Sequence, residues 1–250
     1  MNLTKFVIDR GGKIKPLLIP YELSKGTGLM NPSILIKDGR ILMNVRGVQY
    51  LILHSENKQF FNSKWGPLAY MNPENDMHLR TTNFFVELDE EMNPIQITQV
   101  DTSKLDITPV WEFIGLEDVR LVYWNDKYYY CGVRRDTKPN GEGRIELSEI
   151  VITKDSVKEI SRNRIEPPVQ SYCEKNWMPI VDKPFHFVKW TNPTEIVQVD
   201  LSSNLSTTIF QSEVLIPNLP DLRGGSSVIH HKEHYYAVTH DVRLFKNKLG

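Results

Sequence analysis

The sequence predicts an all-β protein: a five-bladed β-propeller in a single domain over residues 1–250, with the last blade incomplete towards the C-terminus. Three observations lead to this expectation. Short runs rich in Val, Ile, Tyr, Phe and Thr alternate with turns rich in Gly, Asn, Asp and Pro, which is typical of β-strands. Apolar residues keep helical spacing for no more than about two turns. A unit with a polar start and an apolar hairpin recurs four times.

Strand signals run along the whole chain. The clearest candidates are residues 41–46, 82–88, 120–124, 128–134, 145–152, 195–199 and 234–240. Residues 87–94 contain Asn and Pro and are expected to form a hairpin turn. Residues 156–164 are the best helical candidate.

Each repeated unit begins with a polar cluster, called a head below. The heads are Asn31-Pro32-Ser33, Glu117-Asp118-Val119-Arg120, Glu174-Lys175-Asn176-Trp177 and Arg223-Gly224-Gly225-Ser226. The last two intervals are near the roughly 40–50 residues of a propeller blade, and the first leaves room for long insertions. Because the innermost strands of a propeller begin at one end of its axis, we expect the heads to converge on a central funnel. The alternative is a β-sandwich with aperiodic insertions.

Composition and charge exclude several classes of partner. The 30 basic and 31 acidic residues give a net charge of -1, so no broad electrostatic footprint for nucleic acid or anionic membrane is expected. Residues 1–10 lack the long apolar stretch of a secretory signal, and no run approaches the roughly 18 apolar residues of a membrane span. We therefore expect a soluble cytoplasmic protein.

The cysteines and histidines do not suggest a metal site. Cys131 lies in an apolar run and Cys173 directly before the third head, and we expect two buried free thiols, with a disulfide as the alternative. A turn holds His230, His231 and His234, without the spacing of zinc ligands. No metal and no cofactor are expected.

The four heads, in this order and spacing, resemble those of glycoside hydrolase family 130 and its relatives. These include β-mannoside phosphorylases, β-1,2-mannosidases and related mannosyltransferases with five-bladed propellers. The resemblance spans residues 28 to 240 and includes Arg46 at the end of the strand after the first head. One position departs from the pattern: Val119 stands where the family fingerprint Glu-Asp-Pro-Arg has proline.

The resemblance implies roles for individual residues. Asp118 matches the family's general acid, which protonates the glycosidic oxygen in a single inverting displacement. Residues implied in phosphate binding are Arg46, Lys175, His186 and either Arg134 or Arg135. Inorganic phosphate or a nucleotide-sugar is the implied co-substrate. Substrate contacts are expected from the heads and Arg46, namely Asn31, Arg46, Glu117, Arg120, Glu174, Lys175, Asn176, Trp177 and Arg223.

The chemistry of the second head sets further expectations. Alternate residues of a strand share a face, so Asp118 and Arg120 are expected to pair, with Glu117 on the opposite face. Such pairing lowers the pKa of Asp118. A hydrolase would need a second carboxylate to activate water, for which Glu174 and Asp221 are candidates. Trp177, inside a head, is the best candidate to stack on a sugar ring.

Two functions follow from these observations. The first is a carbohydrate-active enzyme that acts on β-mannosides or similar glycosides by inverting phosphorolysis, hydrolysis or glycosyl transfer. The alternative is a non-catalytic sugar-binding or scaffolding propeller, because one fold hosts many functions. The expected partner is a small-molecule or oligosaccharide substrate. An open edge blade would also favour association into oligomers.

Overall fold

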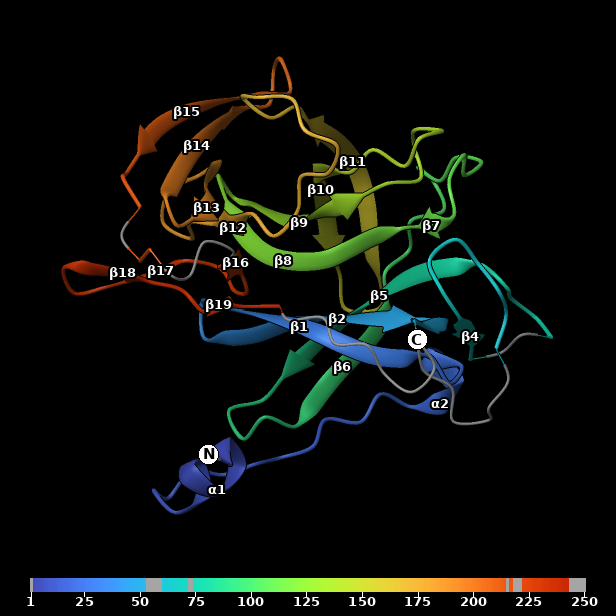
Figure 1. Ribbon diagram of the computed structural model, residues 1–250. Helices are drawn as coiled ribbons and strands as arrows, with labels where there is room; N and C mark the ends of the chain where they lie inside the picture. The colour runs from blue at the N-terminus through green and yellow to red at the C-terminus, as the bar shows by residue number, and fades with distance from the viewer. Residues whose placement is uncertain (1, 53–59, 72–73, 215, 218–221, 243–250) are drawn as a thin grey trace.

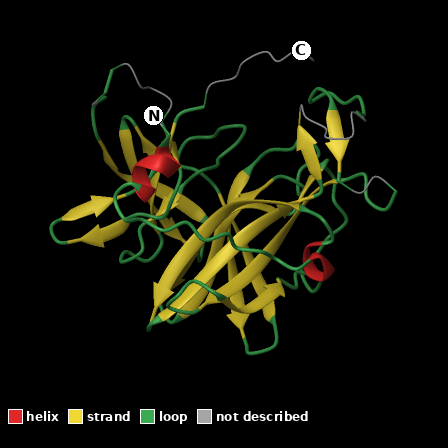
Figure 2. Cartoon of the chain, turned by 90° about the horizontal axis from the view of Figure 1, so that it is seen from below, coloured by secondary structure: helices red, strands yellow, loops and turns green. Residues whose placement is uncertain are grey.

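The computed structural model describes residues 2–52, 60–71, 74–214, 216–217 and 222–242. Within them the chain is all-β, as predicted, apart from two short helices, α1 (Leu3–Ile8) and α2 (Tyr21–Ser24), that the sequence did not predict. Figure 1 shows successive sheets arranged around a central region, and Figure 2 gives the view from below. No helix among the described residues is long and apolar enough to cross a bilayer.

The first sheet has the strand order β1-β2-β5-β6 and is antiparallel throughout this path. Its strands are β1 (Gly28–Lys37), β2 (Arg40–Val48), β5 (Leu79–Leu88) and β6 (Pro94–Gln99). The hairpin of β3 (Tyr50–Ile52) and β4 (Leu68–Tyr70) is inserted between β2 and β5, and β7 (Phe113–Ile114) pairs in parallel with the start of β5. These additions account for the long interval between the first two heads.

The second and third sheets are simple four-stranded antiparallel meanders. The second comprises β8 (Leu116–Trp124), β9 (Lys127–Arg134), β10 (Arg144–Ile152) and β11 (Val157–Ile165). The third comprises β12 (Met178–Pro179), β13 (His186–Thr191), β14 (Thr194–Asp200) and β15 (Leu205–Gln211). In both, neighbours in sequence are neighbours in space.

The fourth unit is a hairpin interrupted in its middle. The strand pairs are β16 (Arg223–Gly224) with β19 (Thr239–His240) and β17 (Ile229–His231) with β18 (His234–Tyr236). Between them, Val228 lies parallel to the third sheet: its N–H donates to the Pro179 carbonyl at 2.8 Å and its carbonyl accepts from Val181 N–H at 3.0 Å. The fourth hairpin is thereby attached to β12.

Apolar cores lie between successive sheets. One core joins the first two sheets through residues such as Leu42, Phe85, Leu121, Tyr130 and Val157. A second joins the second and third sheets around Trp124, Leu147, Trp177, Phe187 and Val197. A small third core holds Met178, Ile180 and Val228 between the third sheet and the hairpin. Each sheet therefore buries a face against the next, which a single small sheet cannot do alone.

Six of the seven predicted strands lie within strands of the structure, and the predicted turn joins β5 to β6. The seventh, predicted over residues 234–240, is divided between β18 and β19, because residues 237–238 belong to neither strand. The helix predicted over residues 156–164 is wrong, because this segment is β11, in which Val157 and Glu159 are buried while Lys158 and Ile160 are exposed. That alternation has the period of a strand. Both cysteines are free, as predicted, but only Cys131 is buried, whereas Cys173 is partly exposed.

Candidate functional site

Three of the four heads share a backbone feature where a first strand begins. Asn31, Asp118 and Asn176 have φ of 48°, 52° and 61°. These values lie in the left-handed region, which Asn and Asp adopt more readily than other side-chain-bearing residues. In β1 and β8 the left-handed residue lies within a break in the strand register. Such strained positions cluster at functional sites, so the heads are candidates for one.

Arg46 on β2 is the centre of the contacts between the first and second heads. Its Nη2 lies 3.0 Å from Glu117 Oε2 and its Nη1 lies 2.7 Å from Asp118 Oδ1. The same guanidinium donates to Thr81 Oγ1 at 3.0 and 3.2 Å and to the Tyr50 hydroxyl at 3.2 Å. Asn31 adds an amide hydrogen bond to Asp118 Oδ1 at 2.5 Å. With Arg46 only 6 % exposed, the result is a largely buried charge cluster.

The register break corrects the predicted geometry of the second head. Glu117 and Asp118 do not lie on opposite faces, because both carboxyl groups bind Arg46. Arg120 does not pair with the Asp118 carboxylate and instead donates to its backbone carbonyl at 3.0 Å. The left-handed φ of Asp118 interrupts the strand's alternation, so that neighbouring side chains reach one partner.

The two carboxyl groups on Arg46 differ in their ionisation. Burial raises the pKa of Glu117 above its ordinary value, and the neighbouring charge of Asp118 adds to this against the opposing charge of Arg46. Burial acts on Asp118 in the same direction, but the charge of Arg46 and hydrogen bonds from Asn31 and Arg46 outweigh it, so the pKa of Asp118 is lowered. In this cluster Glu117 therefore retains its proton more readily than an ordinary glutamate, whereas Asp118 remains ionised more readily than an ordinary aspartate.

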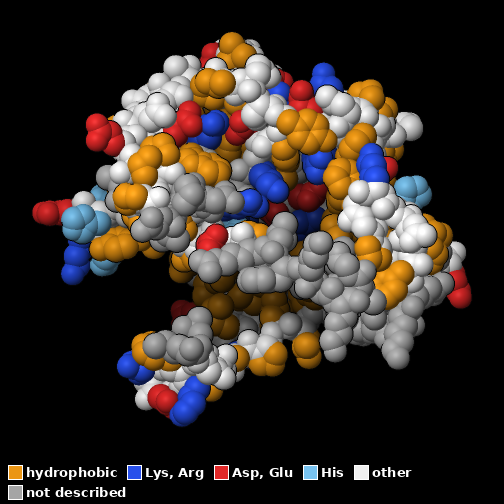
Figure 3. Space-filling view, in the orientation of Figure 1, with side chains coloured by type: hydrophobic (Ala, Val, Ile, Leu, Met, Phe, Trp, Pro, Cys, Tyr) orange, Lys and Arg blue, Asp and Glu red, His pale blue; other side chains and the backbone are white. Residues whose placement is uncertain are grey.

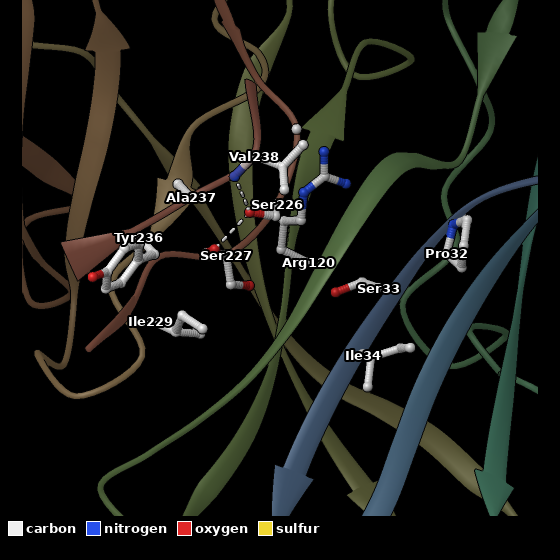
Figure 4. Close-up of a pocket in the computed structure, with 11 residues that line it drawn as sticks. Pro32, Ser33, Ile34, Arg120, Ser226, Ser227, Ile229, Tyr236, Ala237 and Val238 are labelled. Carbon is white, nitrogen blue, oxygen red and sulfur yellow. Dashed lines mark hydrogen bonds between the residues drawn. The ribbon is translucent and has the colours of Figure 1, made fainter. Parts of the chain in front are cut away.

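A cavity of 560 Å³ opens where the first, second and fourth heads meet. Figure 4 shows Arg120 between Ser33 of the first head and the hairpin residues Ser226 and Val238. Ser33 Oγ accepts the Leu121 N–H at 3.0 Å, and Ser226 Oγ accepts the Val238 N–H at 2.9 Å. These hydrogen bonds hold the cavity walls together.

The third and fourth heads line a neighbouring cavity of 250 Å³ that is rich in cations. Lys175, Asn176, Lys189 and Arg223 surround it together with Glu174. Lys189 lies 3.0 Å from Glu195 and 4.0 Å from Glu174, and the charge of Lys175 acts on Glu117 of the second head. Figure 3 shows basic and acidic side chains gathered in a central hollow of this face.

Two residues of the third head have structural roles: Trp177 lies in the core, and Glu174, at the edge of the cation-rich cavity, holds it. Trp177 is 2 % exposed and packs against Phe187 in the core, so its ring has no free face for a sugar and the predicted stacking role is wrong. Its indole N–H donates to Glu174 Oε2 at 2.8 Å, and Ser171 Oγ donates to Glu174 Oε1 at 2.6 Å. Glu174 is thus buried and positions Trp177.

Other predicted residues lie away from Arg46. Arg134 is buried beside a cavity between the first two sheets, where its Nε lies 2.7 Å from Glu146 Oε2. His186 faces the cavity between the third sheet and the fourth hairpin, with Nδ1 2.8 Å from the Pro184 carbonyl oxygen. Asp221 lies outside the described residues. In the described part of the chain, no group of three or more His, Cys, Asp and Glu side chains is placed to hold a metal ion.

Two residues that hold Arg46 carried no clear sequence signal. Tyr50 lies in the β3–β4 insertion and Thr81 in β5, and neither belongs to a head. Arg135 is the alternative to Arg134 in the sequence interpretation, and of these two it is the one whose charge, after that of Arg46, opposes the raised pKa of Glu117.

Comparison with known proteins adds no relative: no family model, no curated protein and no solved structure matches this chain.

Proposed function

We propose that the sheets are blades of a five-bladed propeller and that the heads line its axial funnel. Three consecutive sheets, each with an antiparallel path of four strands and each packed on the next, support this arrangement. The first strand of the second sheet also contacts the first strands of both other sheets, since β1 and β12 both contact β8. The fourth hairpin would supply the inner strands of a further blade.

The function that the site supports best is a carbohydrate-active enzyme that acts on β-mannosides or similar glycosides. One observation carries this proposal: Glu117 and Asp118 bind one buried arginine, and their pKa values shift in opposite directions. Glycosidic cleavage needs a proton donor for the leaving oxygen and negative charge near an oxocarbenium-like transition state. Paired carboxyls with separated pKa values are suited to such acid–base work.

The roles of the two acids follow from their surroundings. Glu117 is the proposed proton donor, because its raised pKa favours the protonated form. Asp118 is the proposed carboxylate, held by Arg46 and Asn31. This assignment differs from the family resemblance, in which Asp118 is the general acid.

The nucleophile would come from outside this pair. Two carboxyls on one guanidinium leave no room between them for the substrate and water that a two-carboxylate inverting enzyme must hold. The cation-rich cavity beside Lys175, Lys189 and Arg223 suits an anion, and we assign it to inorganic phosphate. Phosphorolysis is therefore the proposed reaction, ahead of hydrolysis or transfer from a nucleotide-sugar.

A second candidate is a non-catalytic sugar-binding or scaffolding protein. The observation in its favour is that Arg46 is saturated by its own partners and joins two sheets, as a structural ion pair would. In that case the acids would matter for stability and not for turnover.

Assays with β-mannosides, with and without phosphate and with a nucleotide-mannose donor, test the proposal. The wild type, Glu117→Gln and Asp118→Asn would be compared, with folding checked by circular dichroism. Phosphate-dependent release of mannose 1-phosphate that Glu117→Gln abolishes is the expected result. Sugar binding without turnover under any condition would support the non-catalytic alternative.

A further inference from the structure

A group of aromatic side chains and one arginine, here called the aromatic rim, comes from four separate segments. It consists of Trp65 before β4, Phe113 on β7, Arg135 after β9 and Tyr172 before β12. The Arg135 guanidinium carbon lies 5.7 Å from the Trp65 ring centre, 5.3 Å from that of Phe113 and 5.7 Å from that of Tyr172. Arginine over aromatic faces is a stabilising arrangement, so Arg135 holds the group together.

The rim is continuous with the Arg46 cluster. The Tyr50 hydroxyl accepts a hydrogen bond from Arg46, and its ring lies 5.9 Å from that of Phe113. Phe113 in turn lies 5.2 Å from the Trp65 ring, edge to face. Trp65 is fixed at its other end by an indole hydrogen bond of 2.5 Å to Glu112. Contacts therefore lead from the charge cluster to the rim without a break.

Tyr172 has an unusual orientation for an exposed tyrosine. A surface tyrosine commonly buries its ring and turns its hydroxyl to water. Here the hydroxyl is bound by the protein: it accepts from Arg135 Nη2 at 3.1 Å and donates to the Asn140 carbonyl at 2.9 Å. The residue is nevertheless 54 % exposed. The apolar ring is thus presented to solvent and held in place by its polar end.

A fixed, exposed aromatic ring next to a polar site suits the apolar face of a pyranose. Stacking of this kind loses little conformational entropy when the ring is immobilised before the ligand arrives. The contacts place the rim beside the second head: Phe113 of the rim packs against Tyr50, whose hydroxyl binds Arg46, and Arg46 in turn binds Glu117.

We propose that Tyr172, held by Arg135, is a stacking platform for a second sugar ring, so that the ligand is a β-linked oligosaccharide of at least two residues. This inference rests on the proposed carbohydrate function. The ring next to Glu117 and Arg46 would occupy the charged centre, and the next ring would lie on Tyr172. Specificity for chain length would then reside in the rim.

Calorimetric titration of the full chain with methyl β-mannoside and with a β-linked mannobiose tests this inference. We expect the wild type to bind the disaccharide about tenfold more tightly, as one favourable aromatic contact allows. Tyr172→Ala should bring the two affinities within about twofold of each other and leave that for the monosaccharide unchanged. Tyr172→Phe, which keeps the ring and loses both hydroxyl contacts, should retain part of the preference. The control is Tyr21→Ala, which removes an exposed tyrosine on α2.

The outcomes separate the two proposals. A preference for the disaccharide that survives in Tyr172→Ala would overturn the platform and leave the carbohydrate function standing. Absence of binding of either sugar to the folded wild type would overturn both. Melting curves of each variant establish that the fold is retained.

Discussion

Arg46 on β2 and Asp118 on β8 form an ion pair of 2.7 Å that joins the first sheet to the second. The contact is largely buried, and the same arginine also binds Glu117 at 3.0 Å. A single cation thus compensates two acids at the interface between two sheets. Removing it leaves two uncompensated carboxyl groups away from water.

The first prediction concerns this arginine. Arg46→Met should lower the free energy of unfolding by about 3–5 kcal/mol, because breaking a buried pair leaves charge without a partner. Urea denaturation measures the change. The matched control is Arg40→Met on the same strand β2, which removes a more exposed pair with Glu87 on β5 and should cost about 1 kcal/mol or less. Equal losses in the two variants would show that Arg46 contributes no more than a surface pair.

The strands were predictable from the sequence because they satisfy local rules. The run from Leu121 to Trp124 and the run from Tyr128 to Val133 flank an Asn-Asp turn, and β8 and β9 lie there. The helix predicted over residues 156–164 was wrong because this segment has too few apolar residues to show the alternation of a strand. Pairing with β10, a tertiary effect, makes them a strand.

The candidate site was predictable in some of its members but not in its geometry. The heads do meet around common cavities, since Ser33, Arg120 and Ser226 line one and Lys175 and Arg223 line another. The ion-pair partners of the second head depend on the left-handed φ of Asp118, and the alternation of side chains along a strand does not predict this φ. Trp177 shows the same limit, because a tryptophan in a polar segment gives no sign that its ring turns into the core.

The second prediction tests the turn that leads into the second head. Gly115 has a φ of +97°, and a Cβ there would lie 2.5 Å from the Thr81 carbonyl oxygen. Gly115→Ala should therefore destabilise the protein by both backbone strain and a clash. Gly39→Ala is the control, since its φ is +77° with nothing within 4 Å of the added carbon.

Strain alone is expected to cost about 1–3 kcal/mol at either glycine. We expect Gly115→Ala to cost at least about 1 kcal/mol more than Gly39→Ala in thermal or urea unfolding, because overpacking adds to strain. Thr81 also binds Arg46, so the same substitution should weaken any sugar binding at the Arg46 cluster. If Gly115→Ala destabilised the protein no more than Gly39→Ala, the Thr81 backbone would be able to move away from the added carbon at no cost in stability.

The third prediction separates a core role from a sugar-binding role for Trp177. Trp177→Phe keeps an aromatic ring in the core but removes the indole N–H that satisfies Glu174. The loss should be about 1–3 kcal/mol, the cost of a buried acceptor left without its donor, plus a cavity contribution. Unfolding of the single variants and of the double variant with Glu174→Gln gives the coupling between the two side chains. A coupling near zero would show that the hydrogen bond adds nothing to stability.

The fourth prediction uses the opposite pKa shifts of Glu117 and Asp118. The folded pKa of Glu117 is raised, so its protonated form stabilises the fold fully below its ordinary value of 4.5, and this contribution is lost as pH rises through the folded pKa. Asp118 behaves in the reverse way. The folded pKa of Asp118 is lowered, so its ionised form stabilises the fold fully above the ordinary value of 3.8. This contribution is lost as pH falls through the folded pKa.

Unfolding free energies measured from acidic to neutral pH should therefore respond differently to the two isosteric substitutions. Relative to the wild type, Glu117→Gln should gain stability as pH rises above 4.5, because glutamine has no proton to lose. Asp118→Asn should be most destabilised at neutral pH, with a deficit that shrinks below pH 3.8, where the wild type also loses its carboxylate. Parallel dependences of the unfolding free energy on pH in the two variants would contradict the division of roles. Two acids that ionise alike could not act one as proton donor and the other as carboxylate.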